Sequence, residues 1–258
     1  MNNVNKTLYI PLYGKAYVSR LGLFLQDSKA EEIWAKEGFP LKGKAKSKWL
    51  AYNMGMRSAV FDRWLESRMK EDPEAVILHV GCGMDSRCLR VDAGSRCWFD
   101  VDFPDVIAQR AQYFTETNTY HMIGSDIRNP AWLEEIPKSC RAIIVMEGVS
   151  MYLSPEELNQ VLTVWQNHFS HISLLMDTYT TFAAKATKYR NPINEVGVTE
   201  VFGMDSPECV TGLRFVAEHT LTPEDMIARL KKSEQSFFRR LFAGKLAKKI
   251  YRLYEYQT

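Results

Sequence analysis

The sequence predicts an α/β protein with a doubly wound, mostly parallel sheet and an N-terminal helical addition. From residue 75 onward, short apolar runs of strand length alternate with segments that have helical spacing. This alternation is typical of βαβ units, which place helices on both faces of a parallel sheet. Before residue 75 the apolar residues recur at helical spacing between polar loops, so this part is expected to be helical.

The N-terminal part, residues 1–73, is expected to form a helical cap on a domain that spans 74–258. The segment 61–70 places four apolar side chains on one face of a helix: Phe61, Trp64, Leu65 and Met69. This helix is expected to end before Pro73, because proline disfavours the α conformation in the residue that precedes it.

Six apolar runs are expected to be strands: 75–80, 97–102, 120–126, 142–147, 172–177 and 214–219. The first and fourth are continuous apolar runs, which is typical of parallel strands that are buried on both faces. Pro104 follows the second run at a position that suits the first turn of a helix. The aromatic segment after Ile250 fits either a last strand or the end of a helix.

Two later helices have recognisable start signals. Ser154 suits an N-cap, Pro155 suits the first turn, and Glu157 completes a capping box. A helix is therefore expected from this point to about His168. The segment 222–225, Thr-Pro-Glu-Asp, predicts another helix start on the same grounds.

Composition excludes several classes of protein. The chain has 258 residues and a net charge of +2, and this near-neutral balance argues against a dedicated nucleic-acid-binding protein. No apolar run approaches the ~20 residues that span a bilayer, and the N-terminus lacks a secretory signal pattern. The five cysteines lack CxxC spacing, which suits free thiols and predicts a cytoplasmic location. No histidine or cysteine pair has convincing metal-ligand spacing, so no metal site is predicted.

The C-terminal tail, residues 231–258, departs from this neutral average. It holds eight basic and two acidic residues, a local charge of +6. Six apolar side chains run through it: Phe237, Phe238, Leu241, Phe242, Leu246 and Ile250. This spacing predicts an amphipathic helix that docks its apolar face on the domain, with contact to a membrane surface as the alternative.

Acidic residues follow nearly every expected strand. They are Asp85, Asp100, Asp102, Asp126, Glu147 and Asp177. Ligands of such sheets bind outside the carboxyl ends of the strands. The sequence therefore predicts a pocket there for a ligand that carries hydroxyls, amines or positive charge.

The glycine turn after the first strand favours one kind of nucleotide-like cofactor. A dinucleotide-binding turn has the pattern G-x-G-x-x-G, whereas Ser86 stands here at the third glycine position after Gly81 and Gly83. Asp85 would also repel a pyrophosphate, so the turn favours S-adenosylmethionine. Asp100 or Asp102 is spaced to accept hydrogen bonds from ribose hydroxyls, which fits either cofactor.

Four segments carry a family resemblance: 57–62 (RSAVFD), 76–91 (VILHVGCGMDSRCLRV), 98–110 (WFDVDFPDVIAQR) and 146–158 (MEGVSMYLSPEEL). Together they resemble the leucine carboxyl methyltransferase family, which includes bacterial enzymes similar to a tetracenomycin polyketide O-methyltransferase. The resemblance implies a class I, Rossmann-like methyltransferase with a seven-stranded sheet and S-adenosylmethionine as cofactor. It also implies an acceptor-site insertion near 180–212.

The resemblance assigns a cofactor-binding role to each matching position. Arg57 would hold the methionine carboxylate of the cofactor, and Glu147 would face its methionine amino end. Gly81 and Gly83 would let the backbone approach the cofactor closely. Asp102 or Asp100 would bind the ribose, and Asp126 with the amide of Ile127 would hold the adenine. Two plainer interpretations remain open: Arg57 as a helix-surface ion pair, and Asp126 as a turn former.

The expected reaction is methylation of a carboxylate on a small, polyketide-like molecule or at a protein C-terminus. An ionised carboxylate needs no general base, and none of the five histidines is a persuasive one. Tyr152 and Tyr179 are candidates for lining the acceptor site. Two alternatives stay open, an NAD(P)-dependent oxidoreductase and a non-catalytic relative that only binds the cofactor.

Overall fold

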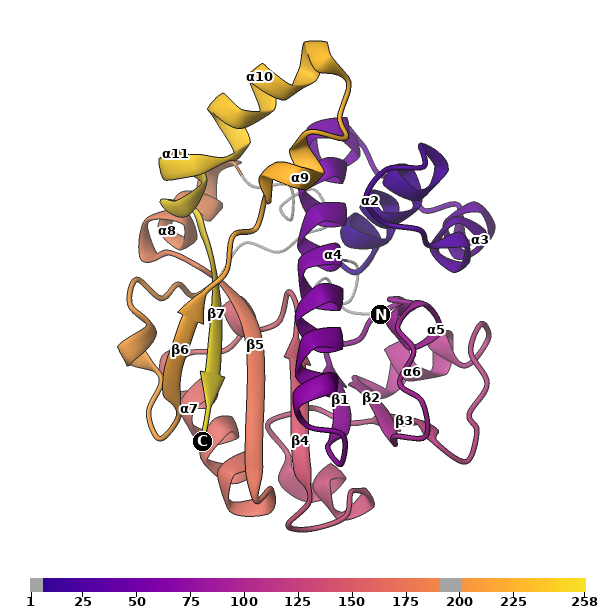
Figure 1. Cartoon of the computed structure of the whole chain (residues 1–258), viewed down its shortest axis with the longest axis vertical. Coiled ribbons are helices and arrows are strands. Elements are labelled where there is room, and N and C mark those ends of the chain that lie inside the picture. The colour runs from indigo at the N-terminus through magenta and orange to yellow at the C-terminus, as the bar shows by residue number, and fades with distance from the viewer. Residues whose placement is uncertain (1–6, 191–200) are drawn as a thin grey trace.

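The computed structural model describes residues 7–190 and 201–258, which form a seven-stranded sheet flanked by helices (Figure 1). The sheet order is β3-β2-β1-β4-β5-β7-β6. The strands are β1 (Val76–Val80), β2 (Trp98–Asp102), β3 (Tyr120–Gly124), β4 (Arg141–Met146), β5 (His171–Tyr179), β6 (Arg214–Glu218) and β7 (Tyr251–Gln257). Strands β1 to β5 pair in parallel, and β7 lies antiparallel between β5 and β6. The predicted α/β class and mostly parallel sheet are confirmed.

Helices precede the sheet and connect its strands. They are α2 (Tyr9–Arg20), α3 (Ser28–Glu37), α4 (Lys48–Glu71), α5 (Arg87–Arg90), α6 (Pro104–Arg110), α7 (Pro155–His168), α8 (Thr181–Arg190), α9 (Glu224–Ile227), α10 (Lys232–Phe242) and α11 (Gly244–Lys248). Short 3₁₀ turns are η1 (Gly43–Lys46), η2 (Pro130–Glu135), η3 (Ser150–Tyr152) and η5 (Pro207–Cys209). The capping box expected at Ser154 starts α7, with both of its hydrogen bonds formed.

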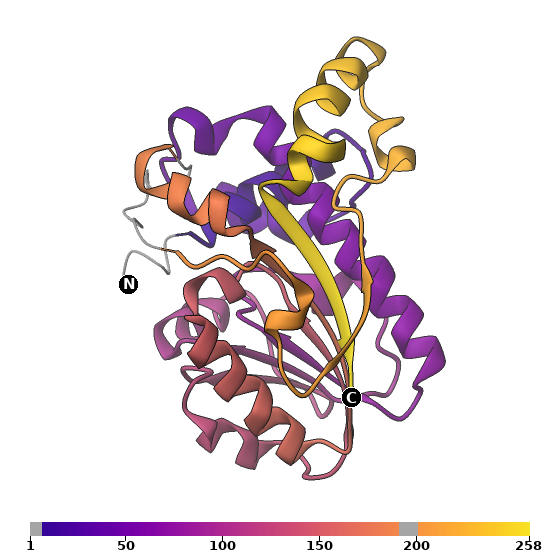
Figure 2. The ribbon, with the colours of Figure 1, turned by 90° about the vertical axis from the view of Figure 1, so that its left-hand side faces the viewer.

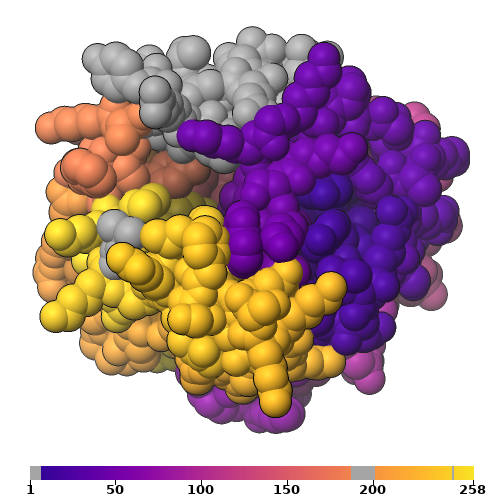
Figure 3. Space-filling model, turned by 90° about the horizontal axis from the view of Figure 1, so that it is seen from above, coloured from indigo at the N-terminus to yellow at the C-terminus, as the bar shows by residue number. Residues whose placement is uncertain are grey.

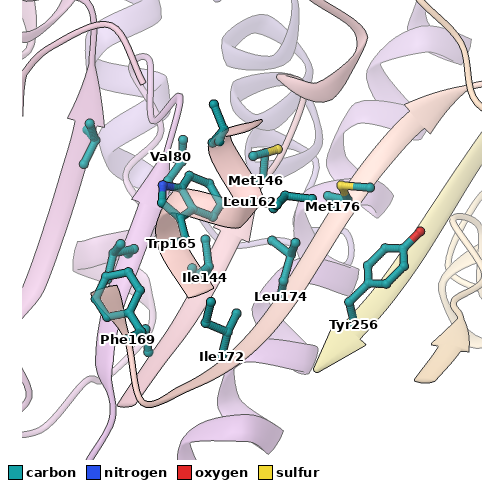
Figure 4. Packing of buried hydrophobic residues seen from close by; sticks show 14 of the residues in the cluster. Val80, Ile144, Met146, Leu162, Trp165, Phe169, Ile172, Leu174, Met176 and Tyr256 are labelled. Atoms are coloured by element: carbon teal, nitrogen blue, oxygen red, sulfur yellow. The ribbon is translucent and has the colours of Figure 1, made fainter. Parts of the chain in front are cut away.

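The sheet is covered on both faces (Figure 2). On one face, α7 packs Leu162 and Trp165 against Ile144 and Leu174 of the central strands (Figure 4). On the other face, α4 supplies most of the contacts, including Phe61. Burial on both faces explains why β1 and β4 are apolar throughout. The chain reverses its strand order between them, which places a ligand crevice at their carboxyl ends.

Helix α4 begins earlier than the sequence pattern indicated. Its N-cap is Ser47, whose hydroxyl accepts a hydrogen bond from the amide of Trp49. Its last residue is Glu71, so it ends before Pro73, as expected. Gly55 lets this helix approach α2 closely, because a Cβ there would lie 2.6 Å from Cγ2 of Val18. The N-terminal helices therefore pack directly on the central helix of the sheet.

The C-terminal part corrects two predictions. The helix expected from Thr222 is the four-residue α9, which starts at Glu224 with Pro223 at the N-cap and no side-chain cap. The single amphipathic helix expected in the tail 231–258 is two helices, α10 and α11. Ala243 lies between them, and Gly244, the first residue of α11, has a φ of +70°, a conformation that ends the preceding helix. The open choice for the last aromatic segment is settled as strand β7.

Neither a membrane-spanning helix nor a metal site occurs among the described residues. No helix there is both long and apolar enough to cross a membrane. Across 7–190 and 201–258, no group of three or more His, Cys, Asp or Glu side chains is arranged to hold a metal ion.

Candidate functional site

A cavity of about 610 Å³ lies at the carboxyl ends of β1, β2 and β4. This volume is in the range of small-molecule sites. It collects most of the residues that the sequence singled out from separate strand ends. Those that line it are Arg57, Gly81, Gly83, Asp102, Asp126, Ile127, Glu147, Tyr152 and Tyr179. Of the other acidic residues at strand ends, Asp85 also lines the cavity, whereas Asp100 and Asp177 do not.

The glycine turn after β1 brings bare backbone to the cavity wall. Gly81 and Gly83 have φ values of +66° and +50°, which glycine adopts readily and other residues rarely do. A Cβ on Gly81 would lie 2.1 Å from Cγ2 of Val149, so the loops after β1 and β4 touch there. The loop after β4 can therefore approach this turn so closely only because Gly81 carries no side chain.

Asp102 lies at the end of β2 with its carboxylate at the cavity. Its oxygens accept the amides of Gly83 and Phe103, each at 2.7 Å. Burial raises the pKa of the Asp102 carboxyl to about 6, although these two amides act to lower it. Each oxygen retains a second lone pair for a ligand hydroxyl.

Asp100 has a different role, inside the protein. Its carboxylate accepts Trp98 Nε1 at 2.8 Å and Tyr120 Oη at 2.6 Å, and it pairs with Arg110. Burial acts to raise its pKa, but Arg110 and His79 outweigh burial and lower it to about 2. Asp100 thus holds β2, β3 and α6 together, and a ligand in the cavity would meet Asp102.

Arg57 reaches from α4 to the ends of β4 and β5. Its Nε donates to Oε1 of Glu147 at 3.0 Å, and its Nη1 donates to Oδ2 of Asp177 at 3.1 Å and to Tyr251 Oη at 2.8 Å. Among residues 7–190 and 201–258, no hydrogen bond engages its Nη2. Arg57 is 6% exposed, so the interpretation as a surface ion pair is wrong.

Glu147 is held by two arginines. Besides Arg57, its Oε2 accepts Nη2 of Arg87 at 2.5 Å. Burial opposes ionisation of Glu147, but Arg57 and Arg87 outweigh burial and lower the pKa of its carboxyl. The side chain is therefore an anion fixed in position at the cavity.

A buried ion-pair network beneath the cavity was not predicted. Arg87 Nε and Arg90 Nε each donate to Asp62 at 2.6 Å. Ser58, one residue after Arg57, accepts from both arginines. The segment 57–62 therefore positions the glycine-turn helix α5. The Arg-Ser-x-x-x-Asp pattern of residues 57–62 was visible in the sequence. The arginines that Ser58 and Asp62 bind, Arg87 and Arg90, lie in α5, after the glycine turn.

Lys15 is a second cation at the cavity that sequence reasoning missed. It comes from α2, is 3% exposed, and pairs with Oδ2 of Asp85 at 3.0 Å. Burial lowers the pKa of its ammonium group although Asp85 acts to raise it. Arg90 contacts Asp85 from the other side at 2.6 Å. Lys15 and Arg90 therefore compensate the negative charge of Asp85, a pairing that the sequence alone did not indicate.

Asp126 is both a turn former and a cavity residue. Its Oδ1 accepts the backbone amide of Arg128 at 3.0 Å, which makes an Asx turn, and its carboxylate pairs with the Arg128 guanidinium. The hydrogen bond from that side chain lowers the pKa of Asp126. The turn places Ile127 at the cavity wall.

The cavity continues into a mainly apolar end away from the glycine turn. Its walls there include Leu50, Met54, Leu241, Phe242 and Ile250. Three tyrosines bound it: Tyr152, Tyr179 and Tyr251, the last two with ring centroids 5.2 Å apart. These contributions come from α4, η3, β5, α10 and β7, so widely separated segments form one chamber.

His79 is the one histidine among the described residues that line the cavity. It is 1% exposed, with Nδ1 at 3.2 Å from Asp100 and Nε2 at 3.1 Å from Arg87. Burial lowers the pKa of its ring. Both ring nitrogens are engaged, so His79 is not placed to take a proton from a ligand in the apolar end.

The chain is similar to known methyltransferases in sequence. The model of the leucine carboxyl methyltransferase family matches residues 9–166. A tetracenomycin polyketide synthesis O-methyltransferase from Streptomyces glaucescens is 27% identical over 91% of this chain and 89% of its own length. An S-adenosyl-L-methionine-dependent methyltransferase from Gibberella zeae is 34% identical over 44% of this chain and 41% of its own.

Solved structures share the fold at low sequence identity. A Thermobifida fusca protein assigned as a methyltransferase superposes with a TM-score of 0.58 at 14% identity, covering 95% of this chain and 94% of its own. Magnesium protoporphyrin IX methyltransferase from Synechocystis, solved with S-adenosylhomocysteine, has a TM-score of 0.51 at 9% identity, covering 89% and 92%.

Proposed function

The chain belongs to the leucine carboxyl methyltransferase family, and we propose that this S-adenosylmethionine-dependent methyltransferase acts on a carboxylate of an apolar small molecule. The family does not favour the oxidoreductase alternative. One observation carries the proposal: an apolar chamber without an available histidine adjoins a polar, glycine-lined end of the same cavity.

The polar end fits the cofactor. The unsubstituted backbone of Gly81 gives close approach, and Asp102 supplies acceptors for the ribose hydroxyls. Nη2 of Arg57, with Lys15 nearby on the same wall, suits the methionine carboxylate, and the fixed anion Glu147 suits its amino group. Ile127 and Asp126 remain the proposed adenine contacts. When bound, the cofactor supplies a methyl group on a cationic sulfur, which is already activated for transfer.

The apolar end is the proposed acceptor site. Its aliphatic and aromatic walls fit a hydrophobic acceptor, and Tyr152 and Tyr179 bound it where it meets the polar end. A carboxylate acceptor is ionised at neutral pH, so the protein needs to position it and to exclude water, with no proton to remove. The relative from Streptomyces glaucescens is named for polyketide synthesis, which supports a small-molecule acceptor here.

The surrounding segments have proposed roles as well. The helices within 1–73 would cap the cavity, since Ile10 and Met54 line it. The segment 180–212 would shape the acceptor site; its part 191–200 lies outside the described residues. All five cysteines are unpaired, which supports the proposed cytoplasmic location.

The chemistry of the product tests the acceptor class. Purified protein is incubated with methyl-labelled cofactor and a panel of one- to four-ring aromatic carboxylic acids, each beside its matched phenol, and with a peptide that ends in leucine. We expect label on the aromatic acids, released as volatile methanol by mild alkali, because esters hydrolyse and ethers do not. Label that resists alkali would assign a hydroxyl acceptor, and cofactor binding without transfer to any probe would favour a non-catalytic relative.

Cofactor affinity is expected to fall as the pH falls through about 6, because hydroxyl donors bind the ionised Asp102 carboxylate. At pH 5 about a tenth of this carboxyl is ionised, so the dissociation constant is expected to be about tenfold higher than at pH 8. Isothermal titration between these pH values measures the change. The variant Asp102→Asn should bind more weakly at pH 8 and lose most of the pH dependence; an equal slope in both proteins would exclude Asp102 as its source.

A further inference from the structure

The rim of the apolar chamber is both basic and apolar. Leu241 is 39% exposed and Ile250 is 41% exposed, and both line the cavity, so they lie where it meets solvent. Phe237, one turn before Leu241 on α10, is 45% exposed. Large apolar side chains grouped at a cavity entrance mark an interaction surface more often than isolated ones do.

Cations surround these side chains. Arg240 precedes Leu241, Lys249 precedes Ile250, and Lys245 lies on α11 between them; all three are exposed. No ion pair engages them among residues 7–190 and 201–258. We call these three residues the basic rim.

A second lysine-rich segment lies at the same end of the molecule. Residues 42–48 contain four lysines and no acidic residue. Trp49, which follows them, contacts Phe237 in a tilted arrangement with ring centroids 4.7 Å apart and stacks on Phe242 with centroids 6.0 Å apart. Figure 3 looks down on this end, where the start of α4 borders α10 and α11. The two most basic stretches of the chain therefore form one face.

Helix α10 presents this face rigidly. Phe238 is fully buried, and the carboxylate of Glu234 accepts Lys48 Nζ at 2.8 Å and Tyr52 Oη at 3.0 Å. These contacts fix the inner side of the helix on α4. Its outer side, with Phe237 and Arg240, therefore remains directed toward solvent.

We propose that this face docks the protein on an anionic lipid bilayer; resting on the proposed function, this docking would let the chamber take its acceptor from the membrane. Amphipathic helices with cations beside Phe and Leu side chains are typical of interfacial binding, and each basic residue near an anionic surface adds to the attraction. An apolar acceptor partitions into a bilayer, and the chamber opens between the apolar rim residues. The charge of the face requires an anionic partner, and its exposed apolar side chains favour lipid over a polar protein surface.

Vesicle sedimentation of the full chain tests the proposal without knowledge of the acceptor. We expect the protein to pellet with vesicles of phosphatidylcholine that contain about one third phosphatidylglycerol, and at least about tenfold less with phosphatidylcholine alone. The variant Lys245→Glu with Lys249→Glu should lose at least about tenfold in partitioning to the anionic vesicles. Neither lysine lines the cavity, so cofactor binding by this variant should be unchanged.

A matched control separates the rim from net charge. The variant Lys70→Glu with Lys138→Glu changes the net charge equally at exposed positions away from the rim, since Lys70 lies at the other end of α4. It should pellet like the unmodified protein. Equal losses in both variants, or equal binding to both vesicle types, would overturn the proposal. Rim-dependent binding to an acidic acyl carrier protein, with none to vesicles, would overturn it in favour of a protein partner.

Discussion

Replacing Arg57 by methionine is expected to lower the free energy of unfolding by about 3–5 kcal/mol and to abolish measurable cofactor binding. Arg57 is the cation between the carboxylates of Glu147 and Asp177, and both carboxylates are buried. Removing one partner of a buried ion pair leaves an uncompensated charge, which costs far more than losing an exposed pair. Urea unfolding measures the first effect and isothermal titration with the cofactor measures the second.

Two further variants make this result interpretable. Arg63→Met removes another arginine of α4, whose pair with Asp225 is exposed on both sides, and it should cost less than about 1 kcal/mol. Adding Asp177→Asn to Arg57→Met neutralises the carboxylate left without this cation, whereas Glu147 keeps Arg87; the double variant should regain about 1–2 kcal/mol without regaining cofactor binding. Equal stability of the Arg57 and Arg63 variants would contradict the role given to the buried pair.

Local signals explain what the sequence could predict. Strands β1 and β4 were recognisable because parallel strands buried on both faces are apolar throughout. Helix α7 was recognisable because Ser154, Pro155 and Glu157 satisfy its first turn locally. The acidic strand ends converge because parallel strands share one carboxyl edge. Nine candidates therefore line one cavity although their sequence positions are far apart.

The remaining features depend on contacts that no local pattern encodes. Lys15 lies in an otherwise ordinary helix, and only the packing of α2 brings it to Asp85. Asp100 and Asp102 lie two residues apart on the same face of one strand. Asp102, at the end of the strand, lines the cavity, whereas Asp100, further inside the sheet, pairs with Arg110. Spacing from the glycine turn could not distinguish them. The break at Gly244 was missed because apolar spacing continues past it.

Replacing Gly81 by alanine is expected to abolish cofactor binding, because the new side chain would clash with Val149. The effect of this clash can be measured separately from the effect of backbone strain. A side chain at φ +66° costs about 1–2 kcal/mol, and the new Cβ would lie 2.1 Å from Cγ2 of Val149. Gly22 provides the matched control, since it has φ +60° with nothing within 4 Å of a Cβ, so Gly22→Ala bears only the backbone cost. Unfolding free energies should therefore fall in both variants and by about 1–3 kcal/mol more in Gly81→Ala, because the clash adds to the strain.

The same clash offers a rescue. Val149→Ala removes Cγ2, so the double variant Gly81→Ala with Val149→Ala should regain most of the extra stability while keeping the backbone cost. Cofactor affinity should return only in part, because the methyl group still occupies space at the wall of the cavity. If Gly81→Ala alone bound the cofactor as tightly as the unmodified protein, close approach of the backbone at this turn would not be needed. The charged side chains at the polar end of the cavity would then have to hold the cofactor alone.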